Sequence, residues 1–286
     1  MVKVSVTIMS AGYCLQNQSV ALSGYPSRQI KFPALFALIE HPTAGLILYD
    51  TGYAPRFYQH TRRFPYKLYA LLTPVFVTEG ESAVTQLQAR GIVPKDVDTV
   101  IVSHFHGDHV CGLHDFPTSK FVYFEESHTA VRAKRGLSAV RAAFLPGLLP
   151  DDISARSRAI PLASCAEIGD MISPFTHGVD LFGDGSVIGI HLPGHAVGQM
   201  GLLLQTESSP VFLVADACWH SDAYRLHVPP SRLGKFIQAD APAYMSTLDQ
   251  LHLLHQRSPA LPMLPSHCGD VYQTYVQGIS GRLDAQ

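Results

Sequence analysis

The sequence is short of charge and has no excess of either sign. Charged residues make up 15% of the 286 residues, and 21 basic against 23 acidic side chains leave a net charge of −2. This balance provides no overall basic field for nucleic acid or for an anionic membrane. Because 47% of the residues are hydrophobic, the chain can form a sizeable core, which excludes a disordered protein.

Long apolar runs and paired cysteines are also missing. No stretch approaches the roughly 18 apolar residues of a membrane-spanning helix. The first ten residues, MVKVSVTIMS, alternate as a strand does and lack the apolar core of a secretory signal. The five cysteines are widely spaced without a CxxC pair, which argues against a disulfide framework or a zinc knuckle. We therefore expect a cytoplasmic protein without membrane insertion.

Histidine is the residue that the chain has in excess. There are 15 histidines against 21 Lys and Arg together. Histidine is the commonest metal ligand and the usual acid–base residue near neutral pH. The excess points to a metal or catalytic site, but the count alone does not say which histidines form it.

Short apolar runs that end in turn or polar residues predict strands along the whole chain. The expected strands are residues 4–9, 35–40, 46–49, 99–102, 121–124, 187–191, 200–204 and 211–215. Apolar spacing and end signals predict helices over residues 82–90 and 241–256. No repeat or low-complexity linker divides residues 1–286, so we expect a single α/β domain built in layers.

Two segments are expected to be insertions into this layered domain, near residues 53–76 and 129–170. The first mixes aromatic with basic side chains. Two interpretations of it stay open: a helical excursion whose aromatic rings pack on the core, which we favour, and a cap or dimer surface that forms an apolar substrate pocket. The second is rich in Ala, Leu, Arg and Pro, which predicts helix followed by irregular structure.

The strongest signal is SHFHGDHVC at residues 103–111, directly after a predicted strand. His104, His106, Asp108 and His109 are four ligand-type side chains within six residues, and Gly107 allows a tight loop. His104 and His106 lie on one side of an extended segment, so Asp108 and His109 can serve a second ion. Imidazole and carboxylate suit Zn²⁺, and also Fe or Mn. We therefore predict two divalent metal ions, with zinc favoured.

This motif resembles the signature of the metallo-β-lactamase superfamily, and the rest of the chain matches it in order. Asp50-Thr51-Gly52 is similar to the superfamily's early Asp-x-Gly turn, and residues 194–198, GHAVG, to its Gly-His-x-x-Gly element. Asp216 matches the bridging aspartate and His267 the last metal histidine. The resemblance covers about residues 1–270. It implies an αβ/βα four-layer sandwich with helical insertions.

Within the superfamily, the stretches LPGHAVGQMGLLLQTESSPVFLVADA and ILYDTGY look most like the quorum-quenching N-acyl-homoserine lactone lactonases. The resemblance implies one metal on His104, His106 and His195, a second on Asp108, His109 and His267, and Asp216 bridging them. It implies a metal-dependent hydrolase whose bridging hydroxide opens a lactone or cleaves a related acyl ester. Asp108 would orient the hydroxide and relay a proton. The implied partner is a small acyl substrate, and a homodimer stays open.

One position departs from the lactonase pattern. These lactonases commonly carry a tyrosine three residues after the bridging aspartate, where it helps to hold the substrate carbonyl. Here that residue is Trp219, whose indole N–H donates a hydrogen bond but accepts none. We expect Trp219 or Tyr224 to act as the catalytic helper, with His220 as a further candidate. Cys111, Cys218 and Cys268 lie within two residues of proposed ligands, and we interpret them as small buried neighbours.

Other functions remain as alternatives. The main one is a thioesterase of the glyoxalase II type, which expects a basic patch near the C-terminus, whereas the tail after Asp270 holds Arg282 as its single basic residue. A di-iron oxidoreductase usually has glutamate in place of His106. A nuclease lacks a basic surface here, and a degenerate binding module is disfavoured by the complete ligand set.

Overall fold

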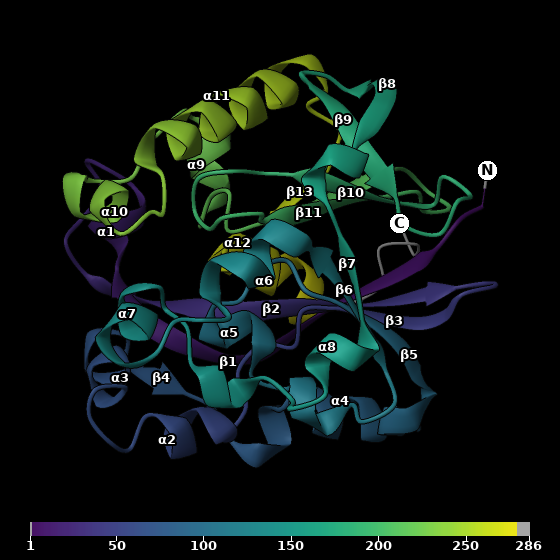
Figure 1. Ribbon diagram of the computed structural model, residues 1–286. Helices are drawn as coiled ribbons and strands as arrows, with labels where there is room; N and C mark the ends of the chain where they lie inside the picture. Colours follow the sequence, from purple (N-terminus) through teal and green to yellow (C-terminus); the bar gives the residue numbers. More distant parts are fainter. Residues whose placement is uncertain (1, 279–286) are drawn as a thin grey trace.

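Two β-sheets lie face to face with helices on their outer sides in the computed structural model, which describes residues 2–278 (Figure 1). The tail residue Arg282 lies outside the described residues. The first sheet has the order β4-β1-β2-β3-β5-β6-β7, and the second the order β13-β12-β11-β10-β9-β8. The helices α11 and α9 lie over the second sheet, and α2 and α4 lie under the first (Figure 1). The expected four-layer αβ/βα sandwich is confirmed.

The strands of the first sheet are β1 (Ser5–Asn17), β2 (Gln29–His41), β3 (Gly45–Tyr49), β4 (Val75–Phe76), β5 (Val97–Ile101), β6 (Lys120–Phe124) and β7 (Ser157–Ile160). Those of the second are β8 (Ala166–Ile172), β9 (Phe175–Asp180), β10 (Val187–His191), β11 (Met200–Leu204), β12 (Val211–Ala215) and β13 (Met263–Pro265). The helices are α1 (Gln18–Ala21), α2 (Arg56–His60), α3 (Lys67–Leu72), α4 (Ala83–Gln88), α5 (Gly107–Val110), α6 (Glu125–Val131), α7 (Gly136–Arg141), α8 (Ile153–Arg156), α9 (Ser221–Arg225), α10 (Arg232–Phe236), α11 (Ala241–Arg257) and α12 (Gly269–Val271).

The inner faces of the two sheets form one apolar core. Ile39 and Ile47 from the first sheet belong to the same buried cluster as Leu202 and Leu204 from the second. Alternation along each strand produces this layer, because successive side chains point to opposite faces of a sheet. The outward side chains and the helices form a second cluster, to which Leu248 and Leu251 of α11 belong.

Parallel pairing brings several strand ends to one edge of the sandwich. β3 and β5 are parallel neighbours in the first sheet, and β12 and β13 are parallel in the second. Two contacts join the sheets there. The Tyr49 hydroxyl donates to the carbonyl oxygen of Met200 at 2.6 Å, and the Leu35 N–H donates to Ser266 at 3.0 Å. Loops that leave these strands are therefore held close together.

Of the two segments expected as insertions, the first is helical, as the favoured interpretation predicts, and the second contains more regular structure than predicted. Residues 53–76 form α2, α3 and the short strand β4, and they bury Phe57 while leaving Phe64 exposed. Residues 129–170 include α7 and α8, but also β7 and β8. The expectation of irregular structure there is wrong for these two strands. Most of their side chains are partly or fully exposed, so no apolar pattern marks them.

None of the helices within residues 2–278 combines the length and the apolar character that a membrane crossing requires.

Candidate metal centre

The site lies where loops leave the ends of strands from both sheets. His104 and His106 follow β5, while Asp108 and His109 lie on α5. The second sheet contributes one residue after each of three strands: His195 after β10, Asp216 after β12 and His267 after β13. All seven ligand candidates are thus brought together. Ligand-type atoms of these seven residues lie within 4.8 Å of one another in three groups: His104, His106, His195; His104, His109, Asp216; and Asp108, His109, His267.

Four of the histidines have their Nδ1 atoms held by a partner outside the cluster. His195 Nδ1 donates to Gln238 Oε1 at 2.8 Å, and His267 Nδ1 donates to the carbonyl oxygen of Pro33 at 2.8 Å. His109 Nδ1 donates to Asp50 Oδ2 at 2.7 Å. A neutral imidazole has one N–H, so a ring that donates through Nδ1 keeps a free electron pair on Nε2. Each Nε2 therefore points into the cluster as a ligand atom.

His104 is fixed in the same way by its sequence neighbour. The Ser103 hydroxyl donates to Asp50 Oδ2 at 2.7 Å, so it accepts from His104 Nδ1 at 3.0 Å. Asp50 also accepts the backbone N–H of Ser103 at 2.8 Å. One buried carboxylate, 1% exposed, thereby orients two of the candidate ligands. Such an outer carboxylate is typical of histidine metal sites.

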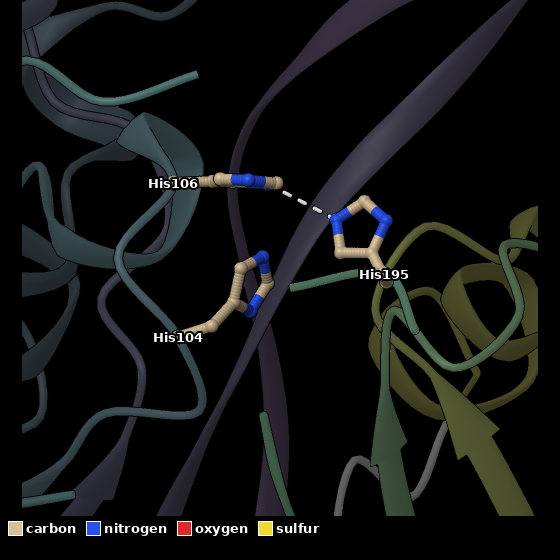
Figure 2. A group of neighbouring side chains, drawn as sticks. All are labelled: His104, His106 and His195. Atoms are coloured by element: carbon tan, nitrogen blue, oxygen red, sulfur yellow. Dashed lines mark hydrogen bonds between the residues drawn. The ribbon is translucent and has the colours of Figure 1, made fainter. Parts of the chain in front are cut away.

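His106 faces the cluster through Nδ1, whereas the other four histidines face it through Nε2. Its Nδ1 lies 3.0 Å from His195 Nε2, and the rings of His104, His106 and His195 converge on one point (Figure 2). The alternation predicted for His104 and His106 therefore places both side chains on the same side of the loop. The three rings come from two different sheets, and a tetrahedral ion needs several convergent nitrogens of this kind.

Two carboxylates complete the cluster. His267 Nε2 lies 3.1 Å from both Asp108 Oδ2 and Asp216 Oδ2, and His195 Nε2 lies 3.2 Å from Asp216 Oδ2. Asp216 thus lies between the two groups of histidines. Within residues 2–278, histidines are the only side chains that form ion pairs with Asp108 and Asp216. Buried carboxylates without Lys or Arg need another source of positive charge.

Burial and charge set the protonation of these groups. Burial lowers the pKa of His104 and of His195, and it lowers the pKa of His106 to about 3. Burial disfavours charge on His109 too, but Asp50, Asp108 and Asp216 outweigh it and raise its pKa. Burial alone would raise the pKa of Asp108, yet His109 and His267 lower it to about 2. The carboxylates are therefore ionised at neutral pH, and three of the rings are neutral.

Unpaired buried atoms test whether a metal fits this site. His109 Nε2 faces Asp216 Oδ1 at 3.4 Å, but neither atom has a hydrogen-bond partner within the described part of the chain. His104 Nε2 is buried and unpaired as well. Leaving such atoms without a partner is costly in a folded protein. Nitrogen and carboxylate ligands around shared points suit a divalent cation, so the residues fit the predicted metals.

The backbone beside the ligands adopts conformations that few residues favour. Asp50 has φ 60° and Ala215, just before Asp216, has φ 47°. Gly194 has φ 124°, and a Cβ there would clash with the backbone nitrogen of Tyr244 on α11. Only glycine therefore fits before His195. Strained positions of this kind concentrate at functional sites.

The proposed helper residues have different positions. Trp219 is near the cluster, where its indole N–H donates to Asp216 Oδ2 at 3.1 Å. Tyr224 is not brought into the cluster, because its hydroxyl donates to the carbonyl oxygen of Met263 at 3.0 Å. His220 Nδ1 accepts the N–H of Asp222 and caps α9. Of the three, Trp219 is the residue in contact with a candidate ligand.

The neighbouring cysteines are buried, as interpreted from the sequence. The Cys111 thiol donates to the carbonyl oxygen of Ala54 at 3.3 Å, and burial raises its pKa to about 12. Burial also raises the pKa of Cys218. Cys268 accepts the N–H of Ser221 at 3.4 Å. All three side chains are therefore packed inside the protein.

Two partners of the site were not found from the sequence. Gln238 follows α10 in a segment without a motif, and its amide is fixed by donation to Gly234 at 2.6 Å. Pro33 contributes a backbone carbonyl, which no residue type signals.

Known relatives extend over most of the chain. N-acyl homoserine lactonase AiiB of Agrobacterium fabrum (strain C58) is 28% identical over 260 residues, which cover 89% of this chain and 86% of that protein. A solved N-acyl homoserine lactone hydrolase, with the product N-hexanoyl-L-homoserine bound at its catalytic metal centre, has a TM-score of 0.71 at 21% identity and 96% coverage of both chains. AidC, a dizinc quorum-quenching lactonase, has a TM-score of 0.63 at 15% identity, with 94% of this chain and 89% of that one covered.

A family model described as the metallo-beta-lactamase superfamily matches residues 32–257. The match includes six of the seven ligand candidates, from His104 to Asp216, and Asp50 beside them. Together with the layered sheets and the convergent ligands, it shows that the chain belongs to the metallo-beta-lactamase superfamily.

Proposed function

We propose that the chain is a dinuclear metal hydrolase that opens lactones of the N-acyl-homoserine type. The observation that carries the proposal is the complete set of ligands, with four Nδ1 atoms fixed by outer partners so that Nε2 faces the cluster. The lactonase names of the relatives support the choice of substrate class. A related acyl ester has the same carbonyl chemistry and belongs to the same proposal.

We propose that His104, His106 and His195 hold one metal, that Asp108, His109 and His267 hold the other, and that Asp216 contacts both. Zinc is the favoured metal because imidazole and carboxylate dominate the ligands, with Fe or Mn as alternatives. When bound, two such ions supply a nucleophile from water at neutral pH and polarise the substrate carbonyl. The surrounding residues of the protein orient the ligands of both ions and set the charge of the site.

Asp108 and Trp219 are proposed to have distinct roles. The low pKa of Asp108, about 2, keeps its carboxylate ionised at neutral pH, so we propose that it orients the attacking water by accepting its hydrogen bond. The Trp219 N–H holds Asp216 Oδ2 and is proposed as a positioning residue. Tyr224 donates to Met263 and is left out of the proposal. The free thiols of all five cysteines are consistent with a cytoplasmic location, which we also propose.

The first test is a hydrolysis screen with the metal-loaded protein. We expect N-acyl-homoserine lactones to be cleaved with a higher kcat/KM than simple esters or acyl thioesters. His106→Ala should lower kcat/KM by more than about 100-fold, since even an outer partner of a metal ligand is worth 10–100-fold. His177→Ala, at an exposed position on β9, is the matched control. Preference for thioesters would favour the glyoxalase II type, and activity on no substrate would refute the hydrolase.

Trp219→Phe tests the positioning role. Loss of the N–H leaves Asp216 Oδ2 without this donor, so we expect kcat to fall by about tenfold while KM changes little. Steady-state kinetics on a homoserine lactone measures both. A change confined to KM would assign Trp219 to substrate binding instead.

A further inference from the structure

The net charge of −2 conceals a strongly uneven distribution of charge. Residues 53–76, 129–149 and 225–237 contain four, four and three basic residues, eleven of the chain's 21, and none of its 23 acidic residues. Among the described residues, ten of these eleven have no acidic partner within 4.0 Å, Arg56 with Asp115 being the exception. The two acids that flank the third segment are engaged elsewhere: Asp222 accepts from Tyr25, and Asp240 caps α11.

The same three segments expose most of the large apolar side chains. They hold ten of the thirteen that are exposed within residues 2–278. Phe64 is 72% exposed, Leu72 is 73% exposed, and Phe236 on α10 is 79% exposed. Isolated apolar residues on a surface are ordinary, whereas a concentration of them marks an interaction site. We call these three segments the basic-apolar rim.

Contacts join the rim into one region. The N–H of Gly136 donates to the Tyr66 hydroxyl at 3.2 Å, which links the first two segments. Gln16 donates to the carbonyl of Leu72 at 3.4 Å, and the N–H of Ser231 donates to Val20 at 3.1 Å. Because residues 16 and 20 belong to the continuous β1–α1 segment, the third segment lies beside the first. In Figure 1, α3, α7, α1 and α10 lie along the same side of the molecule.

The rim borders the metal centre at three points. Tyr69 of α3 packs on Gly107, since a Cβ at this glycine would lie 3.2 Å from its hydroxyl. The N–H of Gly107 donates to the carbonyl of Ala143 at 3.2 Å. Ile237 immediately precedes Gln238, the partner of His195. Each segment therefore reaches a residue of the site or its immediate neighbour.

We propose that the basic-apolar rim docks the protein on the surface of an anionic lipid bilayer, with the metal centre turned toward it. Unpaired Lys and Arg attract anionic headgroups, and exposed apolar side chains can enter the boundary between headgroups and acyl chains. A second copy of the chain fits less well, because a two-fold contact would set this unpaired positive charge against itself. Docking places the metal centre beside the lipid phase, in which acyl-chain substrates dissolve. This consequence rests on the proposed function, whereas the docking itself is independent of it.

Vesicle co-sedimentation tests the proposal with the full chain. We expect binding to vesicles of phosphatidylcholine mixed with phosphatidylglycerol, weakening with added salt, and little binding to phosphatidylcholine alone. Arg62→Gln with Arg63→Gln should weaken binding by about tenfold or more. Phe236→Ser with Ile237→Ser should weaken it comparably. The matched controls, Arg90→Gln with Lys95→Gln and Val93→Ser, are exposed outside the rim and should bind as the parent does.

Several outcomes would overturn docking on a bilayer. They are absence of binding, equal binding to both vesicle types, or equal effects of rim and control variants. Light scattering measures the oligomeric state. If Phe236→Ser with Ile237→Ser converts a dimer into a monomer, the rim is a contact between copies of the chain and the proposal is wrong. Circular dichroism and Tm should be the same in the rim variants as in the parent, which shows that the variants are folded. Binding is measured without substrate, so failure of the proposed function leaves this test intact.

Discussion

At the scale of single residues, the metal centre depends on which ring nitrogen carries the proton. Gln238 Oε1, the Pro33 carbonyl and Asp50 are pure acceptors, and each faces an Nδ1 atom. They fix which nitrogen carries the outer N–H, so that Nε2 faces the cluster. Although burial opposes it, the carboxylates raise the pKa of His109 and of His267, so these two rings release a proton when a metal binds. The short motif at residues 103–111 reveals the ligands because they are close in sequence. Their acceptors come from distant segments and are set by tertiary packing, which the motif does not contain.

Asp50→Asn tests this fixing of the tautomer. An amide at this position loses the charge that His109 faces and the double acceptance from Ser103. We expect metal affinity to fall by about 10–100-fold, as for other outer partners of ligands. Competition with a chromogenic chelator measures the affinity. Asp98→Asn, where the carboxylate accepts the N–H of Leu46, is the control, and equal affinities in the two variants would contradict the role of Asp50.

Thiol reactivity reports on burial around the site. Cys14, Cys111, Cys218 and Cys268 are buried, and Cys165 is partly exposed. Burial raises the pKa of Cys14 and of Cys111 to about 12, so neither forms a thiolate readily. A colorimetric disulfide reagent at mildly alkaline pH should therefore modify Cys165 alone in the folded protein, and all five thiols after unfolding. Fast reaction of a second thiol in Cys165→Ser would contradict the buried positions.

At the scale of elements, the strands that position ligands were the most predictable. β10, β11 and β12 have the bounds expected from their apolar runs, because they are almost wholly buried and end at turn residues. β1 and β2 extend well past their predicted ends into partly exposed polar residues. β8 and β9 were not predicted, since most of their side chains are partly or fully exposed. Apolar patterning therefore identifies buried strands and misses those that water reaches.

His191, the last residue of β10, should make the thermal stability of the protein depend on pH. Burial lowers the pKa of His191 from 6.5, with Glu126 opposing it. The unfolded chain thus takes up a proton at this residue as pH falls below 6.5, while the folded chain does not, so stability declines on acidification. His191→Gln should reduce the loss of Tm between pH 7.5 and 5.5 by up to about 3 °C in calorimetry. An equal benefit from His177→Gln, at an exposed position on β9, would contradict this.

At the scale of the whole molecule, the ligands divide between the two sheets. His104, His106, Asp108 and His109 follow the first sheet, and His195, Asp216 and His267 follow the second. Without metal, ionised carboxylates and unpaired ring nitrogens face one another across the junction between the two sheets. Bound metal should therefore stabilise the packing of sheet on sheet as well as the loops.

Metal removal should lower thermal stability. We expect dialysis against a chelator to lower Tm on the order of 10 °C, and added zinc to restore it. His104→Ala should start with a lower Tm and respond less to the chelator. Calorimetry with parallel metal analysis measures both. A parent protein that loses its metal without any change in Tm would show that the two sheets hold together unaided.

The division of ligands between the sheets also has a consequence for the abundance of the protein. A chain that unfolds more often is cleaved more often by proteases. If the ions hold the two sheets together, a cell deprived of metal loses the polypeptide as well as its activity. Restoring the metal would then require new synthesis before activity returned. The supply of a nutrient would govern the lifetime of the enzyme, and with it the delay before the cell can act on its substrate again.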